Sequence, residues 1–284
     1  MNKIEIVDSN LIANITDESI DYEFAPKDDK LLISSLKLKI KEDTDLELNI
    51  EVNTEDKIDI FINILSGVHL NICEYINGIQ LKIQNKYYLE KNSHVEIRKI
   101  NNINSIKEYD IVNLNGEGAS FKRVLKTIST SQEKYDMLIY HNALNTNSDV
   151  INHGVNMLDG ELIFNVSSFV PKDISGCYAN QTNRIINLTN NKCQICPNMY
   201  IDCFDVIANH SAFIGSFTDE ELFYLQSRGI PQNEATKLLL KGFLTSDLEE
   251  RQKQKYSEIL DKYWRWIYES WRFSNLKKEY NLFW

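Results

Sequence analysis

Residues 197–243 read PNMYIDCFDVIANHSAFIGSFTDEELFYLQSRGIPQNEATKLLLKGF, and the type of secondary structure changes within this stretch. Its first part holds short apolar, strand-sized runs as far as Gly215. Beyond that point Thr218 can cap the backbone N–H of Glu221, and the Glu221 side chain can reach back to Thr218. Phe217 and Leu222 have the spacing of a hydrophobic staple. We therefore expect β-structure to end near Gly215 and a helix to begin at Thr218.

Short runs rich in Ile, Leu and Val fill the chain from residue 31 to about residue 215. Several alternate apolar with polar residues, as Leu36, Leu38 and Ile40 do. No convincing helix intervenes, which favours a sandwich, a barrel or a solenoid. The apolar runs 162–166, 185–188 and 199–207 start roughly twenty residues apart, about one solenoid coil. The middle of the chain thus favours a solenoid.

The region after residue 217 reads as helical. The first helix should stop at Gly229, and Pro231 should start the next. An amphipathic pattern of Tyr256, Ile259, Leu260, Tyr263, Trp264 and Ile267 predicts a further helix in the tail. The remaining tail aromatics are Trp266, Trp271, Phe273, Phe283 and Trp284. They either pack on the solenoid or form a partner-binding face, where Trp and Tyr are common.

Composition excludes several function classes. The 284 residues carry a net charge of −10, which is unfavourable for binding nucleic acid or an anionic membrane. There is no apolar run of about 18 residues and no signal-peptide pattern at the N-terminus, so we expect a cytoplasmic protein. No P-loop, nucleophile elbow or Gly-rich phosphate loop is found. We therefore expect no enzymatic activity, and in particular no ATP hydrolysis.

The cysteines leave two interpretations open. They are Cys73, Cys177, Cys193, Cys196 and Cys203, an odd number for which we expect no disulfides. Cys193 and Cys196 form a CxxC pair, but a structural zinc site normally needs a second pair or added histidines. The thiols are therefore either structural, with Cys203 alternating with Met199 and Ile201 into the core, or ligands of a metal cluster.

The stretch 197–243 resembles the C-terminal core of the SufB/SufD family, the scaffold proteins of the SUF iron–sulfur cluster assembly system. Pro197 stands thirteen residues before His210, and 222–230 is similar to the family block LFYL-x-SRGI. Looser likenesses include the GEGA turn at 116–119, the H-x-A segment from His141 to Ser148, and residues 178–184. The resemblance covers roughly residues 110 to 245. It implies a right-handed parallel β-helix followed by a small C-terminal helical domain.

The resemblance also predicts how the chain is divided. We expect a β-rich segment, early solenoid coils, over residues 1–110, a β-helix core over 111–216 and a helical domain over 217–284. Because members of the family are longer at the N-terminus, the chain looks like a shortened member.

The residues at the family's site are SufD-like. The cysteine expected of SufB, fifteen residues before Pro197, falls on Thr182, and its Glu-His-Glu triplet reads Asn209-His210-Ser211. Iron prefers thiolate ligands, and carboxylates would add anionic ones, so the chain looks like a poor scaffold on its own. The resemblance implies a subunit that pairs with a SufB scaffold near His210, where it could ligate iron. No tightly bound cofactor is expected, only iron or a transient iron–sulfur cluster at the interface with SufB.

The resemblance further implies that the SufC ATPase docks on the C-terminal helices. The residues expected to contact SufC are Leu222, Phe223, Tyr224, Arg228, Gly229 and Phe243. Two alternatives stay open. One is a homodimeric metal or iron–sulfur scaffold that uses Cys193, Cys196, Cys203 and His210. The other is a diverged solenoid that serves only as an interaction module. For His210 itself, the alternative to a ligand role is a hydrogen-bonded interface residue.

Overall fold

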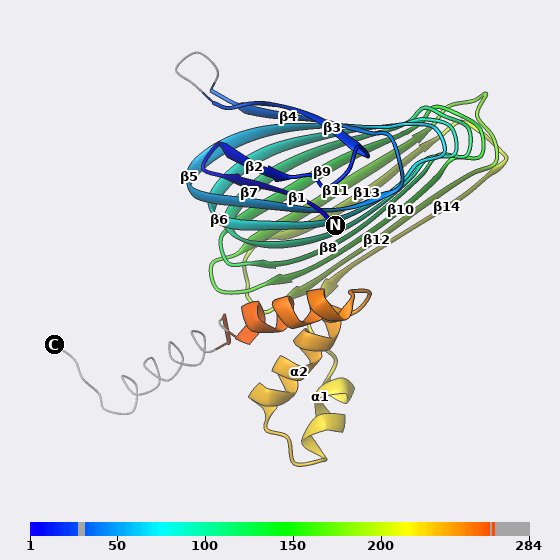
Figure 1. The fold of residues 1–284 in the computed structure, drawn as a ribbon. Coiled ribbons are helices and arrows are strands. Elements are labelled where there is room, and N and C mark those ends of the chain that lie inside the picture. The colour runs from blue at the N-terminus through cyan, green and yellow to red at the C-terminus, as the bar shows by residue number, and fades with distance from the viewer. Residues whose placement is uncertain (28–31, 262, 265–284) are drawn as a thin grey trace. The chain divides into compact units, whose positions relative to one another are not determined.

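The computed structural model describes residues 1–27, 32–261, 263 and 264, and it folds the chain into a β-solenoid (Figure 1). The solenoid has about 7 turns, and strands make up 61% of the structure. In the described part of the chain, three helices follow it. The expected fold class, a mainly β solenoid followed by helices, is confirmed. Contacts along the chain divide it into two compact units, Met1–Ser216 and Phe217–Trp284.

Two stacks of parallel strands build the solenoid, and each coil adds one strand to each stack. The first stack contains β1 (Asn2–Val7), the first halves of β5 (Thr44–Ile64), β6 (His69–Leu89) and β7 (His94–Leu114), then β8 (Ser120–Ser129), β10 (Asn147–Asn156), β12 (Cys177–Asn187) and β14 (Val206–Gly215). The second contains β4 (Ser34–Ile40), the second halves of β5, β6 and β7, then β9 (Gln132–His141), β11 (Glu161–Val170) and β13 (Cys193–Ile201).

The strand register gives the length of a coil. Leu36 pairs with Ile60 in the second stack, and Val150 pairs with Gln181 in the first, so from β4 and β5 onward one coil takes from 24 to 31 residues. The step from β1 to β5 takes 44 residues, because it includes β2 to β4. The expected repeat of roughly twenty residues is therefore wrong. The runs 162–166 and 185–188 belong to β11 and β12, which lie in different stacks. The sequence spacing measured the step from one stack to the other, not a full coil.

Alternation along each strand fills the core. Inward positions of successive coils stack on one another, so apolar side chains form ladders along the solenoid. One such ladder in the first stack is Leu46, Ile72 and Ile97, and one in the second is Ile62, Tyr87 and Val112. All six are buried members of a single core cluster.

The turn after β7 needs glycine at two places. A Cβ on Gly116 would lie 1.9 Å from the backbone nitrogen of Lys91 in the preceding coil, so only glycine fits. Gly118 has φ of +72°, in the left-handed region that other residues avoid. The GEGA segment is thus a turn packed against the turn of its neighbouring coil.

The two ends of the solenoid differ. At the N-terminal end, β2 (Asn10–Asn14) pairs antiparallel with β1, and β3 (Ile20–Ala25) pairs antiparallel with β4. The first strand of each stack, β1 or β4, therefore has a hydrogen-bonded strand on both sides. At the other end, β13 pairs only with β11 and β14 only with β12 among the described residues. The last coil thus presents two strand edges, which are templates for another strand.

The second unit begins with the predicted capping box. Helix α1 (Asp219–Gln226) has Thr218 as its N-cap, and the reciprocal bonds between Thr218 and Glu221 are both present. The helix ends three residues before Gly229, and α2 (Gln232–Thr245) follows with Pro231 as its N-cap residue. A further helical segment covers 250–261, 263 and 264, in line with the predicted tail helix.

The remaining tail aromatics, from Trp266 on, and Ile267 of the helical pattern lie outside the described residues. No helix in the described part of the chain combines the length and apolar character needed to span a membrane.

Candidate assembly site at the last coil

His210 lies on β14, the last strand of the first stack. It pairs in register with Gln181 of β12, which pairs with Val150 of β10. Gln181 and Val150 are fully buried, so His210 occupies the inward-facing position of its strand. The imidazole is nonetheless exposed, because no further coil covers β14 among the described residues. The predicted site residue is therefore accessible at the open end of the solenoid.

The residue in place of the family's cysteine is Thr182, one position from the partner of His210 and on the outward face of β12. Thr182 pairs in register with Ser211, one step along the same two strands. A hydroxyl is a poor ligand for soft metal ions compared with a thiolate. Among the described residues, no three His, Cys, Asp or Glu side chains come together as a metal-binding group. In the described part of the chain, His210 therefore belongs to no group of three or more such side chains.

The two thiols of the CxxC pair do not point toward a common site. Cys193 pairs with buried Leu162 and points inward, and burial raises the pKa of its thiol. Cys196 pairs with Asn165 on the outer face, where its sulfur accepts a hydrogen bond from Gln194 Nε2 at 3.0 Å. The two thiols lie on opposite faces of β13, because residues three apart on a strand differ in parity.

Cys203 does not continue the strand alternation. β13 ends at Ile201, and Cys203 lies half-buried in the loop 202–205 that joins β13 to β14. The expectation that it alternates with Met199 and Ile201 into the core is therefore wrong. All five cysteines are free thiols.

Large apolar side chains are exposed on the last coil. They are Tyr200, Phe204, Ile207, Phe213 and Ile214, and Phe204 is fully exposed. These side chains come from β13, β14 and the loop between the two strands, and exposed apolar patches often mark interaction surfaces. The apolar exposure coincides with the free edges of β13 and β14 and with His210.

A cluster of charged side chains that was not predicted from the sequence lies inside the solenoid. Its members are Glu74, Lys99, Glu108, Asp110 and Arg123, each at most 2% exposed. Lys99 Nζ lies 2.9 Å from Glu74 Oε1 and 2.7 Å from Glu108 Oε2. Arg123 Nη1 lies 3.0 Å from Glu108 Oε1 and also contacts Asp110. Glu74 and Lys99 occupy inward positions two residues after Ile72 and Ile97, a parity signal that could have revealed them.

The two buried acids of β7, Glu108 and Asp110, have pKa values shifted in opposite directions. Burial and the neighbouring Glu108 charge raise the pKa of Asp110 to about 8. Burial opposes ionisation of Glu108 too, but Lys99 and Arg123 outweigh it and hold the Glu108 pKa below its usual value. At neutral pH the cluster therefore keeps a proton on Asp110 while Glu108 is ionised.

Polar contacts lead from this cluster towards the last coil. Arg123 Nη2 donates to Asn152 Oδ1 at 3.0 Å, and Asn152 Nδ2 donates to Asn183 Oδ1 at 2.8 Å. Asn183 pairs in register with Ala212 of β14. The buried network thus extends to the strand next to the one that carries His210.

The upstream family-like segment at His141 is structural. His141 Nδ1 lies 2.8 Å from Thr146 Oγ1, and Nε2 lies 3.0 Å from Ser148 Oγ. Burial lowers the pKa of His141 to about 4, so the ring is neutral at physiological pH. Both ring nitrogens are occupied in holding the turn between β9 and β10.

The residues expected to contact SufC differ in exposure. Phe223 and Tyr224 on α1 are 70% and 56% exposed, and the Arg228 guanidinium lies over the Tyr224 ring at 4.2 Å. Leu222 is half-buried, and Gly229 is exposed with φ of +83°. Phe243 on α2 is buried. Within this unit, α1 therefore offers the accessible aromatic surface.

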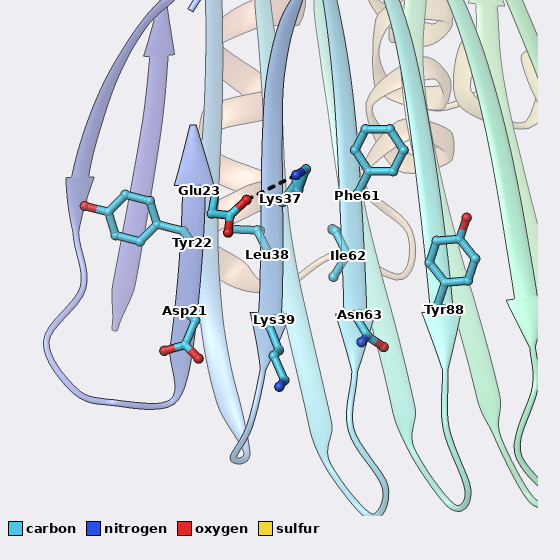
Figure 2. A pocket seen from close by; sticks show the side chains of 10 residues that line it. All are labelled: Asp21, Tyr22, Glu23, Lys37, Leu38, Lys39, Phe61, Ile62, Asn63 and Tyr88. Atoms are coloured by element: carbon cyan, nitrogen blue, oxygen red, sulfur yellow. Dashed lines mark hydrogen bonds and ion pairs between the residues drawn. The ribbon is translucent and has the colours of Figure 1, made fainter. Parts of the chain in front are cut away.

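A groove of about 720 Å³ lies at the opposite end of the solenoid, over β3 to β6 (Figure 2). Its charged side chains are largely paired: Lys37 Nζ lies 3.1 Å from Glu23, and Lys41 pairs with Asp21 at 2.9 Å. Phe61 and Tyr88 line it from β5 and β6. Both carboxylates that line the groove are thus paired with lysines.

The described chain thus combines a parallel β-solenoid, an exposed histidine on its last coil and a following helical unit. A family model described as SUF system FeS cluster assembly, SufBD core domain, matches residues 69–243. The chain belongs to the SufBD family of iron–sulfur cluster assembly proteins. The match begins at residue 69, upstream of the resemblance noted from about residue 110.

Curated relatives match shorter segments. The iron–sulfur cluster assembly protein SufD of Bacillus subtilis is 31% identical over 141 residues, which is 49% of this chain and 32% of that protein. A SufBD family protein of Mycobacterium leprae is 42% identical over 65 residues, 22% of this chain and 17% of its own length. One of Pyrococcus horikoshii is 48% identical over 42 residues, 15% and 9% respectively. The matches thus cover a third or less of each relative.

Proposed function

We propose that this chain is a SufD-like, non-enzymatic subunit of a cytoplasmic SUF complex. It pairs with a SufB-like scaffold through its last coil and docks a SufC-like ATPase on its helices. The single observation that carries this proposal is the position of His210, inward-facing yet exposed on a coil with two free strand edges.

The residues around His210 favour a supporting role. The neighbouring positions hold Thr182, Asn209 and Ser211, which offer no thiolate or carboxylate. A partner must therefore supply the anionic ligands for iron. The likeness to a protein named SufD supports the same assignment.

Strand pairing provides the chemistry of the interface with the scaffold. The free edges of β13 and β14 carry backbone N–H and C=O groups that an added strand can satisfy. Exposed Ile207 and Phe213 add apolar surface along the same coil. Backbone pairing and apolar burial together would fix the partner's register around His210.

Co-expression with the SufB-like and SufC-like proteins of the same cell tests the proposal. We expect a complex of all three on size exclusion. The purified chain alone should stay colourless after anaerobic reconstitution with iron and sulfide. A coloured, cluster-loaded chain without partners would instead support the homodimeric metal scaffold.

Variants on α1 test the docking of the ATPase. Phe223→Ala with Tyr224→Ala should release the SufC-like protein and leave the SufB-like one bound, because exposed aromatics dominate interface energies. Gln226→Ala, an exposed change on the same helix, serves as the matched control. Retention of the ATPase by the double variant would place its docking surface elsewhere.

A further inference from the structure

A stack of aromatic rings runs along the outer face of the second strand stack and ends on the last coil. Tyr140, Phe169 and Tyr200 occupy paired positions on β9, β11 and β13. The ring centroids are 4.8 Å apart at both steps, with interplanar angles of 13° and 7°. Tyr200 is 55% exposed. No ring or cation lies on its outer side among the described residues.

The spacing of the stack defines what can continue it. Neighbouring strands of a sheet lie about 4.7–4.9 Å apart, the same distance that separates these rings. A strand added to the free edge of β13 would therefore bring a side chain into ring-stacking distance of Tyr200. The occupant is thus an extended strand of a partner, with a planar group at the position facing Tyr200.

The charge of the last coil selects the kind of planar group. Residues 193–216 contain Asp202 and Asp205 but no lysine or arginine. Asp202 is exposed and follows Tyr200 by two residues, at the first position of the loop 202–205, where its backbone N–H still bonds the carbonyl of Val170 at 2.9 Å. A guanidinium can stack on the ring and bind a carboxylate at the same time. The chain itself uses this stacking where Arg184 lies over Phe213 at 5.0 Å.

We infer that an arginine on the terminal strand of the SufB-like partner stacks on Tyr200 and pairs with Asp202. This inference rests on the proposed function. It adds the register of the partner strand, which runs along β13 with its arginine opposite Tyr200. Fully exposed Phe204, in the adjoining loop, would enter an apolar site on the same partner.

Calorimetric titration of the purified chain with the SufB-like protein of the same cell tests the inference. Tyr200→Ser should weaken binding roughly tenfold, because it removes the stacking surface. Tyr200→Phe should bind like the wild type. Asp202→Asn should weaken binding and reduce its dependence on salt, since a rim charge acts largely through long-range attraction. Tyr88→Ser, on the same outer face but far from the last coil, is the matched control.

A second measurement identifies the contacting residue. With the photocrosslinker p-benzoylphenylalanine in place of Tyr200, the crosslinked partner peptide should contain an arginine. A peptide without arginine, or wild-type affinity of a correctly folded Tyr200→Ser variant, would overturn the inference alone. If the wild-type chain does not bind the SufB-like protein, the proposed pairing itself is refuted. That result is obtained from the wild-type titration, so it is distinguishable from a failure of the Tyr200 variants.

Discussion

Gln181 and His210 occupy paired positions on β12 and β14, yet the glutamine is fully buried and the histidine is exposed. One coil makes the difference: β12 has a strand on both sides, whereas β14 has only one neighbour among the described residues. Among the described residues, the inward-facing histidine therefore stays accessible on the last coil. Under the proposed function, this exposed position is where the SufB-like partner would meet His210.

His210→Ala should leave the complex with SufB-like and SufC-like partners intact, because one side-chain truncation rarely dissolves a large interface. Cluster production in cells should fall roughly tenfold or more, the scale found when a group that tunes a metal site is lost. A neutral imidazole can ligate iron or hydrogen-bond to a bridging species at physiological pH.

The measurements are complex stoichiometry by size exclusion and cluster yield in cells, with Asn209→Ala as the matched control. Normal yield with His210→Ala would make the histidine a structural residue. Loss of the complex would make it an interface anchor.

Lys99→Met should destabilise the solenoid by about 3–5 kcal/mol, the cost of leaving buried charges without their partner. Lys99 Nζ contacts both Glu74 and Glu108, and all three are nearly inaccessible. Urea unfolding measures the change. Lys82→Met is the control, because Lys82 and Glu55 form an exposed pair at 2.9 Å that should contribute 1 kcal/mol or less. Equal effects of the two variants would refute a structural role for the buried cluster.

Local sequence signals predicted where the first helix begins. The coil length and the exposure of His210 depend on long-range strand pairing, which those signals do not report. The capping box at Thr218 and Glu221 depends on four residues and was confirmed. The coil length depends on which strand pairs with which, and equal apolar runs in the two stacks do not reveal that. Cys203 was misplaced because alternation says nothing about where a strand ends. The position of His210 at an uncovered edge is likewise a property of the last coil and cannot be read from the spacing of its neighbours.

Thr218→Ala should lower the stability of the helical unit by about 1 kcal/mol, since the Thr218 hydroxyl accepts the Glu221 backbone N–H at 3.2 Å. Thermal melting followed by helical circular dichroism measures the loss. Thr236→Ala is the matched control, because the Thr236 hydroxyl bonds a carbonyl within α2 and caps nothing. If Thr218→Ala and Thr236→Ala melt at the same temperature, the role assigned to Thr218 is contradicted.

Glu133 should make the stability of the solenoid depend on pH. Its Oε2 accepts hydrogen bonds from Thr127 Oγ1 at 2.6 Å and from Tyr135 OH at 2.8 Å, in a site that is 2% exposed. Burial is the main cause that raises the Glu133 pKa from 4.5 to about 7, and the Glu108 charge adds to it. Between these two pH values the folded chain binds more protons than the unfolded chain.

The stability that Glu133 contributes in its protonated form is therefore fully present below about pH 4.5 and is lost as the pH rises through about 7. The loss should amount to about 3 kcal/mol, at 1.36 kcal/mol per pKa unit. Glu133→Gln stays neutral at every pH, so its free energy of unfolding should fall less than that of the wild type between pH 5 and pH 8. Glu55→Gln, which removes an exposed carboxylate, should follow the wild type. Urea unfolding of the three proteins at both pH values measures the difference, and parallel curves for wild type and Glu133→Gln would show that the buried carboxyl does not titrate in this range.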